Sequence, residues 1–210
     1  MRTPRSMWSL ETFGRQRLSK HFFMRDFMYS EINGFHGVPN VPENPDLVLR
    51  NGRKLCTQLL DPLEETFGRV AVRSGYRSPE LNAFGNENKL NCAHNDNPIE
   101  CHIWDFNSGD HAIAGASIVI PWFADQYEQG RDWQDLAWWI HDHLAYSDMW
   151  FFPKLAALNL AWRALPQRTI SSYIAPRGTL LKAGDHPAES LPMRQSRYVD
   201  FPKFRGIIYP

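Results

Sequence analysis

The sequence predicts an α+β domain with a small, mainly antiparallel sheet flanked by helices. Segments with helical periodicity and segments with strand periodicity follow one another in mixed order, without the regular alternation of a parallel α/β sheet. Hydrophobic residues make up 43% of the 210 residues, with 8 Trp and 13 Phe, which is enough apolar side-chain area for one full core.

The first predicted elements lie before residue 69. Residues 18–33 mix aromatic and charged positions, which predicts a short helix or an ordered arm. Apolar residues then recur at helical spacing from Asp46 to Leu63, and Gly68 ends this helix. Because Asp61 is followed by a proline and, two residues further on, by a glutamate, we expect the helix to kink or restart there.

The later elements are shorter. A strand over residues 70–73 leads through a turn into a helix that Ser78 and its following proline begin, and residues 85–101 form an Asn-rich loop. The remaining expected elements are strands in CHIWDF (101–106) and ASIVIPWF (116–123), a helix in DWQDLAWWIHDHL (132–144), and short elements in YSDMWFF (146–152), LAALNLAW (155–162) and RTISSYIAP (168–176).

The composition of the chain changes twice along its length. We therefore divide it into an N-terminal extension (1–17), a domain (18–175), and a C-terminal tail (176–210) rich in Gly, Pro and polar residues. This tail is predicted to wrap the domain or to dock to a partner.

The charge balance narrows the classes of partner. Lys plus Arg equals Asp plus Glu at 23 each, so no overall field attracts nucleic acid or an anionic membrane. The N-terminus carries positive charge without the apolar stretch of a signal peptide, and no apolar run is long enough for membrane insertion. We expect a protein that is cytoplasmic as synthesised, with its three Cys in a reducing compartment.

The segment VAVRSGYRSPELN (70–82) contains the first candidate binding residue, Arg77. Its guanidinium stays charged at every relevant pH and can bind a carboxylate through two parallel hydrogen bonds. The alternative is that Arg77 pairs with an internal carboxylate and only braces the turn.

The order helix, strand, SGYRSPELN resembles the first motif of the zinc D-alanyl-D-alanine carboxypeptidases and dipeptidases, which share their fold with the signalling domain of hedgehog proteins. The resemblance covers about residues 18–160. It implies a hedgehog-like peptidase fold, and it implies substrate contacts for Tyr76, Arg77 and the adjacent Ser74, with Arg77 engaging a substrate carboxylate.

The same resemblance implies where a zinc site would lie. In this family a His and, seven residues later, an Asp bind zinc, and a third ligand follows an acidic general base by three residues. Here Asp105 takes the place of the metal-binding Asp and Asp148 that of the catalytic base, but Pro98 and Phe151 occupy the other ligand positions. Neither side chain can bind a metal, so the prediction is a chain without zinc.

A substitute zinc site is the alternative. The segment CAHNDNPIECH (92–102) contains Cys92, His94, Cys101 and His102, and the non-standard ligand set would be His102, Asp105 and His94. The spacing is not that of a common zinc finger, and adjacent residues of a regular strand face opposite ways. In the structural interpretation, the cysteines are small buried residues and His102 bonds to the backbone.

Three functions follow from these observations. The first is a zinc-dependent peptidase that acts on D-alanyl peptides of peptidoglycan. The second is a pseudoenzyme that binds a cell-wall peptide in the same cleft without cutting it. The third is a structural or assembly protein, for example of a phage or phage-like particle, that reuses the fold and docks to a structural protein partner through its tail. Fold alone does not choose among them.

Overall fold

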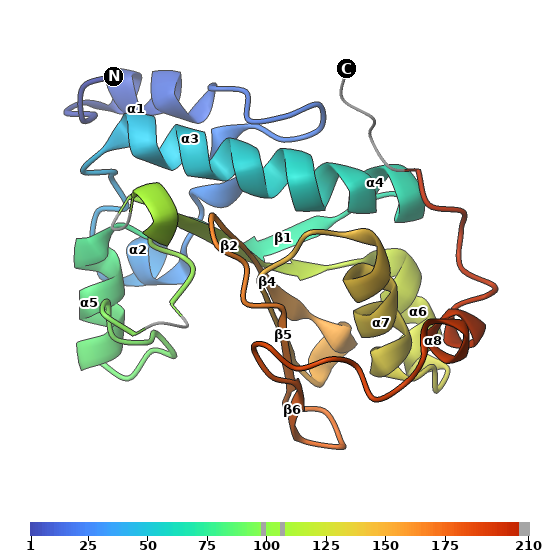
Figure 1. Cartoon of the computed structure of the whole chain (residues 1–210). Coiled ribbons are helices and arrows are strands. Elements are labelled where there is room, and N and C mark those ends of the chain that lie inside the picture. Colours follow the sequence, from blue (N-terminus) through green and yellow to red (C-terminus); the bar gives the residue numbers. More distant parts are fainter. Residues whose placement is uncertain (98–99, 106–107, 206–210) are drawn as a thin grey trace.

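The computed structural model describes residues 1–97, 100–105 and 108–205 and has the predicted α+β class (Figure 1). Its six-stranded sheet has the order β1-β2-β4-β3-β5-β6, in which β3 and β5 run parallel and every other neighbouring pair is antiparallel. The strands are β1 (Ala71–Ser74), β2 (Ile113–Val119), β3 (Asp148–Phe151), β4 (Leu158–Arg163), β5 (Thr169–Ser172) and β6 (Gly178–Leu181).

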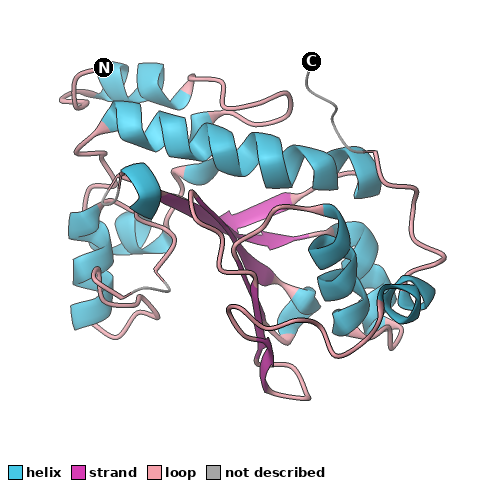
Figure 2. Cartoon of the chain, viewed as in Figure 1, coloured by secondary structure: helices cyan, strands magenta, loops and turns pink. Residues whose placement is uncertain are grey.

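Helices lie on both sides of this sheet (Figure 2). They are α1 (Met7–Gly14), α2 (Glu31–His36), α3 (Pro45–Leu55), α4 (Asp61–Phe67), α5 (Pro79–Glu87), α6 (Pro121–Glu128), α7 (Trp133–His143) and α8 (Leu191–Arg197). None of the helices in the described parts of the chain combines the length and the hydrophobicity that crossing a bilayer requires.

The long helix over the sheet restarts where the sequence predicts it. Asn44 caps α3 by accepting a hydrogen bond from the backbone N–H of Leu47, and a π-helical turn (Cys56–Leu60) joins α3 to α4. Pro62 lacks the N–H that a continuous α-helix would use, so the hydrogen bonds change register just before it. Gly68, at φ +80°, ends α4.

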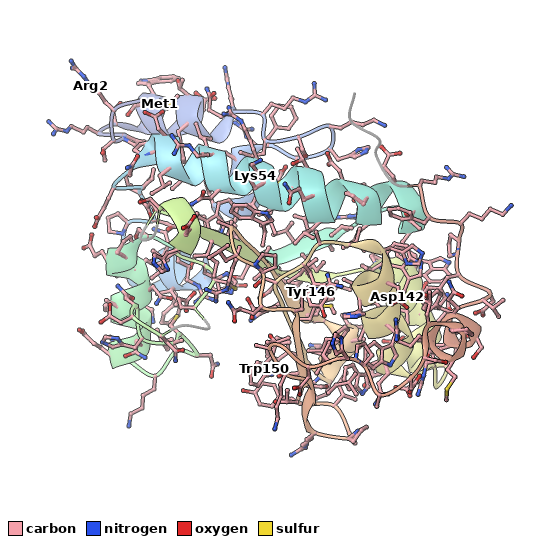
Figure 3. The ribbon with its side chains drawn as sticks, in the orientation of Figure 1. Met1, Arg2, Lys54, Asp142, Tyr146 and Trp150 are labelled. Atoms are coloured by element: carbon pink, nitrogen blue, oxygen red, sulfur yellow. The ribbon has the colours of Figure 1, made fainter. Side chains whose placement is uncertain are left out.

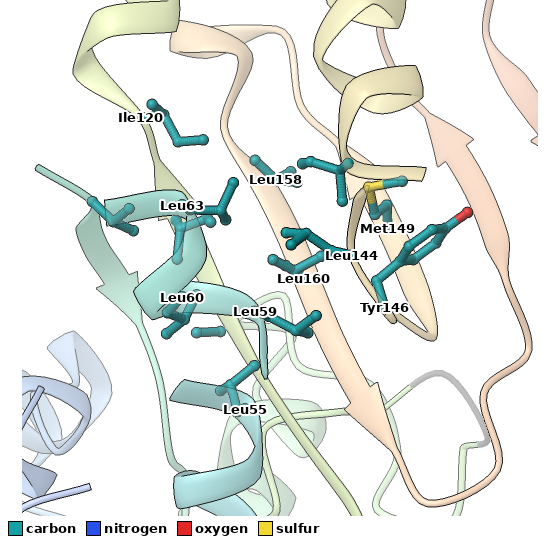
Figure 4. Close-up of a cluster of buried hydrophobic side chains, with 14 of the residues drawn as sticks. Leu55, Leu59, Leu60, Leu63, Ile120, Leu144, Tyr146, Met149, Leu158 and Leu160 are labelled. Atoms are coloured by element: carbon teal, nitrogen blue, oxygen red, sulfur yellow. The ribbon is translucent and has the colours of Figure 1, made fainter. Parts of the chain in front are cut away.

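The two faces of the sheet have opposite character because side chains of a strand alternate. On one face the paired residues are apolar, as in Met149 opposite Leu160 and Phe151 opposite Leu158. Figure 4 shows leucines of the α3–α4 helix packed against this face together with residues of the segment that follows α7. The other face carries Ser117, which is paired with Asn159, and both residues line a cleft.

One predicted strand does not form. Residues 101–105 are buried or half-buried but irregular, and Phe106 lies outside the described residues. Their polar groups bond to distant segments instead of a neighbouring strand, as when the carbonyl of Trp104 accepts a hydrogen bond from Asn51 Nδ2 (2.7 Å). The ASIVIPWF segment also divides, because β2 ends at Val119 and Pro121 begins α6.

Both ends of the chain pack onto the central domain. Phe13 of α1 is fully buried in the main core, so residues before 18 contribute to that core. In the tail, β6 pairs with β5, and α8 lies against α7. The described part of the tail, residues 176–205, therefore contributes a strand to the sheet and a helix packed on α7, and residues 206–210 lie outside the described residues.

A buried ion pair holds α8 on α7. Arg194 Nη2 lies 2.7 Å from Asp142 Oδ1, and the two side chains are only 10% and 7% exposed. Tyr198 donates a further hydrogen bond to Asp142 (2.8 Å). Removing either charge would leave the other desolvated without its counter-ion.

We therefore expect Arg194→Ala to lower the free energy of unfolding by about 3 kcal/mol, measured by urea denaturation. The matched control is Arg15→Ala, which breaks the exposed pair between Arg15 and Glu11 and should change stability little. Equal effects of the two substitutions would contradict this account of the tail.

Candidate functional site

The polar face of the sheet forms the floor of a cleft of about 1220 Å³. One wall comes from the loop segments around residues 91–93 and 100–102, which lie with α5 on the side of the sheet opposite α6, α7 and α8 (Figure 1). Charged and polar residues that line the cleft include Arg77, Glu100, His102, Asp148, Asn159 and Arg163. The cleft thus combines ionisable groups with one open, concave surface, as binding sites do.

The turn after β1 presents Arg77 because two of its neighbours have specific structural roles. A Cβ atom on Gly75 would lie 2.6 Å from the Cβ and 2.7 Å from the Cα of Phe27, so only glycine fits there. Ser78 caps α5 by accepting from the N–H of Leu81 (3.2 Å), with Pro79 at the first helical turn. The SGYRSP motif is therefore a tight turn followed by a capped helix.

Arg77 is held by uncharged groups only. Its Nη1 donates to Asn82 Oδ1 (3.0 Å) and to Cys92 Sγ (3.3 Å), and its Nη2 lies 3.4 Å from Ser74 Oγ. No carboxylate of the described residues forms an ion pair with it. The expected alternative, a brace on an internal carboxylate, is therefore absent from the described chain, although the arginine does brace the turn through Asn82.

His102 faces Arg77 across the same corner of the cleft. Its backbone carbonyl accepts from the N–H of Arg77 (2.9 Å), and its Nδ1 bonds to the carbonyl of Gly75 (2.7 Å). Burial and the nearby Arg77 charge lower the pKa of His102 to about 3. The ring is therefore neutral, Nδ1 carries the proton, and Nε2 remains a hydrogen-bond acceptor.

Burial also raises the pKa of neighbouring acidic groups. Glu100 accepts from the backbone N–H of His102 (2.7 Å), and burial raises the pKa of its carboxyl. Burial likewise raises the pKa of the Cys92 and Cys101 thiols, and both cysteines are free. They fit the interpretation as small buried residues, because a metal would need the thiolate form.

Asp148 lies on the cleft face of β3 and is held on both of its oxygens. Oδ2 lies 2.7 Å from Arg163 Nε in an ion pair, and Oδ1 accepts from the hydroxyl of Thr169 (2.9 Å). The structure thus gives the predicted base a fixed orientation in the cleft beside a cation. Its catalytic role stays a prediction.

Two predicted site residues, Tyr76 and Asp105, lie behind the cleft. Tyr76 is fully buried, and its hydroxyl donates to the Asp105 carboxylate at 3.1 Å. Asp105 Oδ2 also accepts from the backbone N–H groups of Glu43 (2.9 Å) and Asn44 (3.1 Å). This carboxylate therefore anchors the chain that enters α3.

The metal ligands proposed from the sequence do not converge. His102 borders the cleft, whereas Asp105 lies behind it and accepts a hydrogen bond from the backbone N–H of Glu43. His94 is exposed on the loop, with its Nδ1 3.6 Å from Asp96 Oδ2. The described residues contain no group of three or more His, Cys, Asp or Glu that could hold a metal ion. The arrangement does not fit the zinc site that the resemblance implies.

Pro98 and Phe151 stand where the resembled family has metal ligands, and the structure describes only the second of them. Pro98 lies outside the described residues. Phe151 is fully buried on the core face, 5.0 Å from the Trp133 ring, whereas Asp148 lies on the cleft face of the same strand. Because the two positions are three residues apart on a regular strand, their side chains point to opposite faces of the sheet.

Sequence reasoning missed part of this site. Arg163 and Asn159 lie on β4 among apolar residues, and no sequence motif distinguishes them. The aromatic residues Trp150, Phe152 and Tyr173 also line the cleft. The available signal was the two-residue period of the strands, which places Asp148, Trp150 and Phe152 on one face.

Comparisons with known proteins found no match for this chain. No protein-family model, no curated protein and no solved structure matches it. Its resemblance to the zinc carboxypeptidases therefore depends on the residues of the SGYRSPELN segment and on Asp105 and Asp148.

Because His102 is buried in its neutral form, the free energy of unfolding should decrease at acidic pH. The unfolded chain binds a proton near pH 6.5 and the folded chain only near pH 3, so this stabilising contribution is complete above pH 6.5 and declines as the pH falls towards 3. At pH 5 the expected loss is about 2 kcal/mol relative to pH 7.5.

Urea denaturation at both pH values would measure this loss in the wild type and in His102→Gln, whose amide does not titrate. The glutamine variant should lose about 2 kcal/mol less than the wild type over this interval. His186→Gln is the control because His186 is exposed. If stability declines equally in the wild type and in His102→Gln, other groups cause the decline. One such group is His141, because burial lowers its pKa to about 4.

Proposed function

We propose that this chain binds a carboxylate-bearing peptide in its cleft through Arg77, as a D-alanyl-D-alanine carboxypeptidase-like domain that works without the family's zinc site. One observation supports this most directly. Arg77 lines the cleft as a charged guanidinium whose partners are an amide oxygen, a thiol and a hydroxyl. None of these three hydrogen-bond partners carries a charge.

The second arginine of the cleft shows the contrast. Arg163 pairs with Asp148, so that these two charges compensate each other. Glu100 interacts electrostatically with Arg77 without a hydrogen bond to it, and burial raises the pKa of the Glu100 carboxyl while the Arg77 charge lowers it in part. An anionic ligand therefore gains most at Arg77, where a carboxylate can form charge-assisted hydrogen bonds.

The substrate class rests on the resemblance. It makes the ligand a peptidoglycan peptide that ends in D-alanine, with its terminal carboxylate at Arg77. His102 Nε2 is a hydrogen-bond acceptor in the same cleft as Arg77. The candidate metal ligands His94, His102 and Asp105 do not converge, so no metal takes part in the proposed binding. The domain is then a pseudoenzyme that recognises a cell-wall peptide.

The second candidate is a structural or assembly role, for example in a phage or phage-like particle. Its support is the outer side of the tail, where Leu191, Met193 and Val199 are 48%, 58% and 82% exposed. Exposed apolar side chains close together in sequence are a feature of protein contact surfaces. In this role the partner is a structural protein and the cleft is a remnant.

The binding proposal predicts that Arg77→Lys weakens binding of a D-alanyl-D-alanine-terminated peptide by about 1.5–3 kcal/mol. Lysine keeps the charge but loses the planar pair of donors. Isothermal titration calorimetry measures the change, and the free energy of unfolding should stay close to that of the wild type.

Arg163→Lys is the matched control, because it changes an arginine of the same cleft that already has a carboxylate partner. Its effect on the peptide should be small. Equal binding by wild type and Arg77→Lys, or no binding by the wild type, argues against the clamp. A larger loss in Arg163→Lys would move the anion site to that residue.

A second prediction concerns zinc. Protein purified without chelator should carry clearly less than one equivalent of zinc by elemental analysis, and it should release no D-alanine from a pentapeptide with added zinc. The reason is that the described ligand candidates point to different places. Near-stoichiometric zinc that His102→Ala or Asp105→Ala abolishes together with activity would restore the peptidase function. Loss of zinc in Cys92→Ser and Cys101→Ser alone would make the metal structural.

A further inference from the structure

Three aromatic side chains form a surface at the end of the cleft away from Arg77. Trp150, Phe152 and Tyr173 all line the cleft, and we call them the aromatic shelf. The ring of Tyr173 lies 5.2 Å from that of Trp150 and 5.6 Å from that of Phe152. Tyr173 is 51% exposed, so the shelf is open to a ligand.

The shelf is not part of the hydrophobic core. Trp150 and Phe152 alternate with Met149 and Phe151, which are buried on the opposite face. Tyr173 continues the cleft-facing series of β5, and its backbone N–H bonds to the carbonyl of Phe151 (2.9 Å). In Figure 3, Trp150 lies on the other side of the sheet from Asp142 and Tyr146. Aromatic area in a concave site, away from the core, is typical of a ligand surface.

The groups around the shelf are mostly neutral hydrogen-bonding groups. Ser171 pairs directly with Trp150 on the cleft face, Thr179 pairs with Ser171, and Asn159 pairs with Trp150 from β4. Gln167 and Lys182 also line this cleft. Hydroxyl and amide groups both donate and accept, which suits a ligand with many hydroxyl groups.

The cleft floor also restricts what kind of ligand can bind. It is the face of a sheet, where the backbone groups of β4, β3 and β5 are already paired with neighbouring strands. An extended peptide therefore cannot add itself as a strand there, and a ligand has to be recognised by side chains. Ser171 Oγ donates to Thr179 Oγ1 (3.4 Å), and Asn159 Oδ1 accepts from Ser117 Oγ. The Thr179 hydroxyl and the Asn159 amide still have donors to offer, which a purely hydrocarbon ligand could not use.

We propose that the aromatic shelf is a saccharide-binding subsite. A pyranose ring packs its C–H face on Trp150 and Tyr173, whose ring faces carry partial negative charge, while its hydroxyl groups bond to Ser171, Thr179 and Asn159. This deepens the proposed function and rests on it in one respect: with a carboxylate at Arg77, the full ligand is a peptide joined to a saccharide.

The dimensions of the sheet agree with such a ligand. Arg77 follows β1, and Tyr173 follows β5, four strand steps away in the sheet order. At the usual strand spacing these steps correspond to about 19 Å across the strands. Because β5 runs antiparallel to β1, Arg77 and Tyr173 also lie toward opposite ends of the sheet, which lengthens the separation. A terminal carboxylate and a sugar ring separated by a short peptide span this distance.

The test uses two soluble probes: a trimer of β-1,4-linked N-acetylglucosamine and a trimer of β-1,4-linked glucose. Binding is measured by titration calorimetry and by chemical-shift changes of indole N–H signals. We expect the wild type to bind at least one trimer, and Trp150→Ala and Tyr173→Ala to weaken that Kd by about 10-fold. Comparison of the two trimers shows whether the N-acetyl group is recognised.

Two variants serve as controls. Trp8→Ala removes a 70% exposed tryptophan of α1 and should leave the Kd unchanged. Trp150→Phe keeps an aromatic face and removes an indole N–H that has no hydrogen-bond partner in the described chain, so it should retain most of the affinity. If Trp150→Ala fails to fold, Tyr173→Ala decides, since its side chain is half exposed.

Binding of neither trimer by the wild type overturns the proposal, and so does unchanged binding in Tyr173→Ala. Arg77→Lys separates the two proposals, because it should weaken the peptide and leave the trimer affinity unchanged. Trimer binding without peptide binding would leave the saccharide subsite standing and remove the carboxylate clamp. Peptide binding without trimer binding would do the reverse.

Discussion

The segment of residues 100–105 is buried without belonging to a helix or a strand, and the site depends on how its polar groups are satisfied. A buried backbone without a ladder needs a separate partner for each group. The Arg77 N–H and the Asn51 amide supply two of them, at the carbonyls of His102 and Trp104, and the Trp104 indole bonds to the Gly115 carbonyl (3.0 Å). These bonds tie the segment to the turn after β1, to α3 and to β2 together, which places His102 and Arg77 at one corner of the cleft.

The second constraint is the two-residue period of the sheet. It gives the core Met149 and Phe151 and gives the cleft Asp148 and Trp150, so one short strand supplies both a packing surface and a functional surface. A base and a ligand three residues apart cannot both face the cleft from a regular β3, whichever residue occupies position 151.

Local signals in the sequence were enough for much of the fold. The capped start of α5 at Ser78 and the restart at Asp61 depend on neighbouring residues, and the structure has both. The CHIWDF segment was predicted as a strand because Ile103 and Trp104 are apolar, and they are indeed buried. Its irregular path depends on distant partners, which periodicity does not reveal. The aromatic shelf was missed for the same reason, since Trp150 and Tyr173 meet only through the parallel pairing of β3 with β5.

The distribution of charge divides the cleft into two chemically different ends. At one end Arg77 has only uncharged hydrogen-bond partners and lies next to the neutral His102 ring, and at the other the shelf offers aromatic faces surrounded by hydroxyl and amide groups. The ion pair of Asp148 with Arg163 lies between them and adds little net charge. A small anion would leave the aromatic end exposed, and a neutral saccharide would leave Arg77 without a counter-ion. A ligand that carries both groups uses all of the cleft, because each end then exchanges its contacts with water for a matched partner.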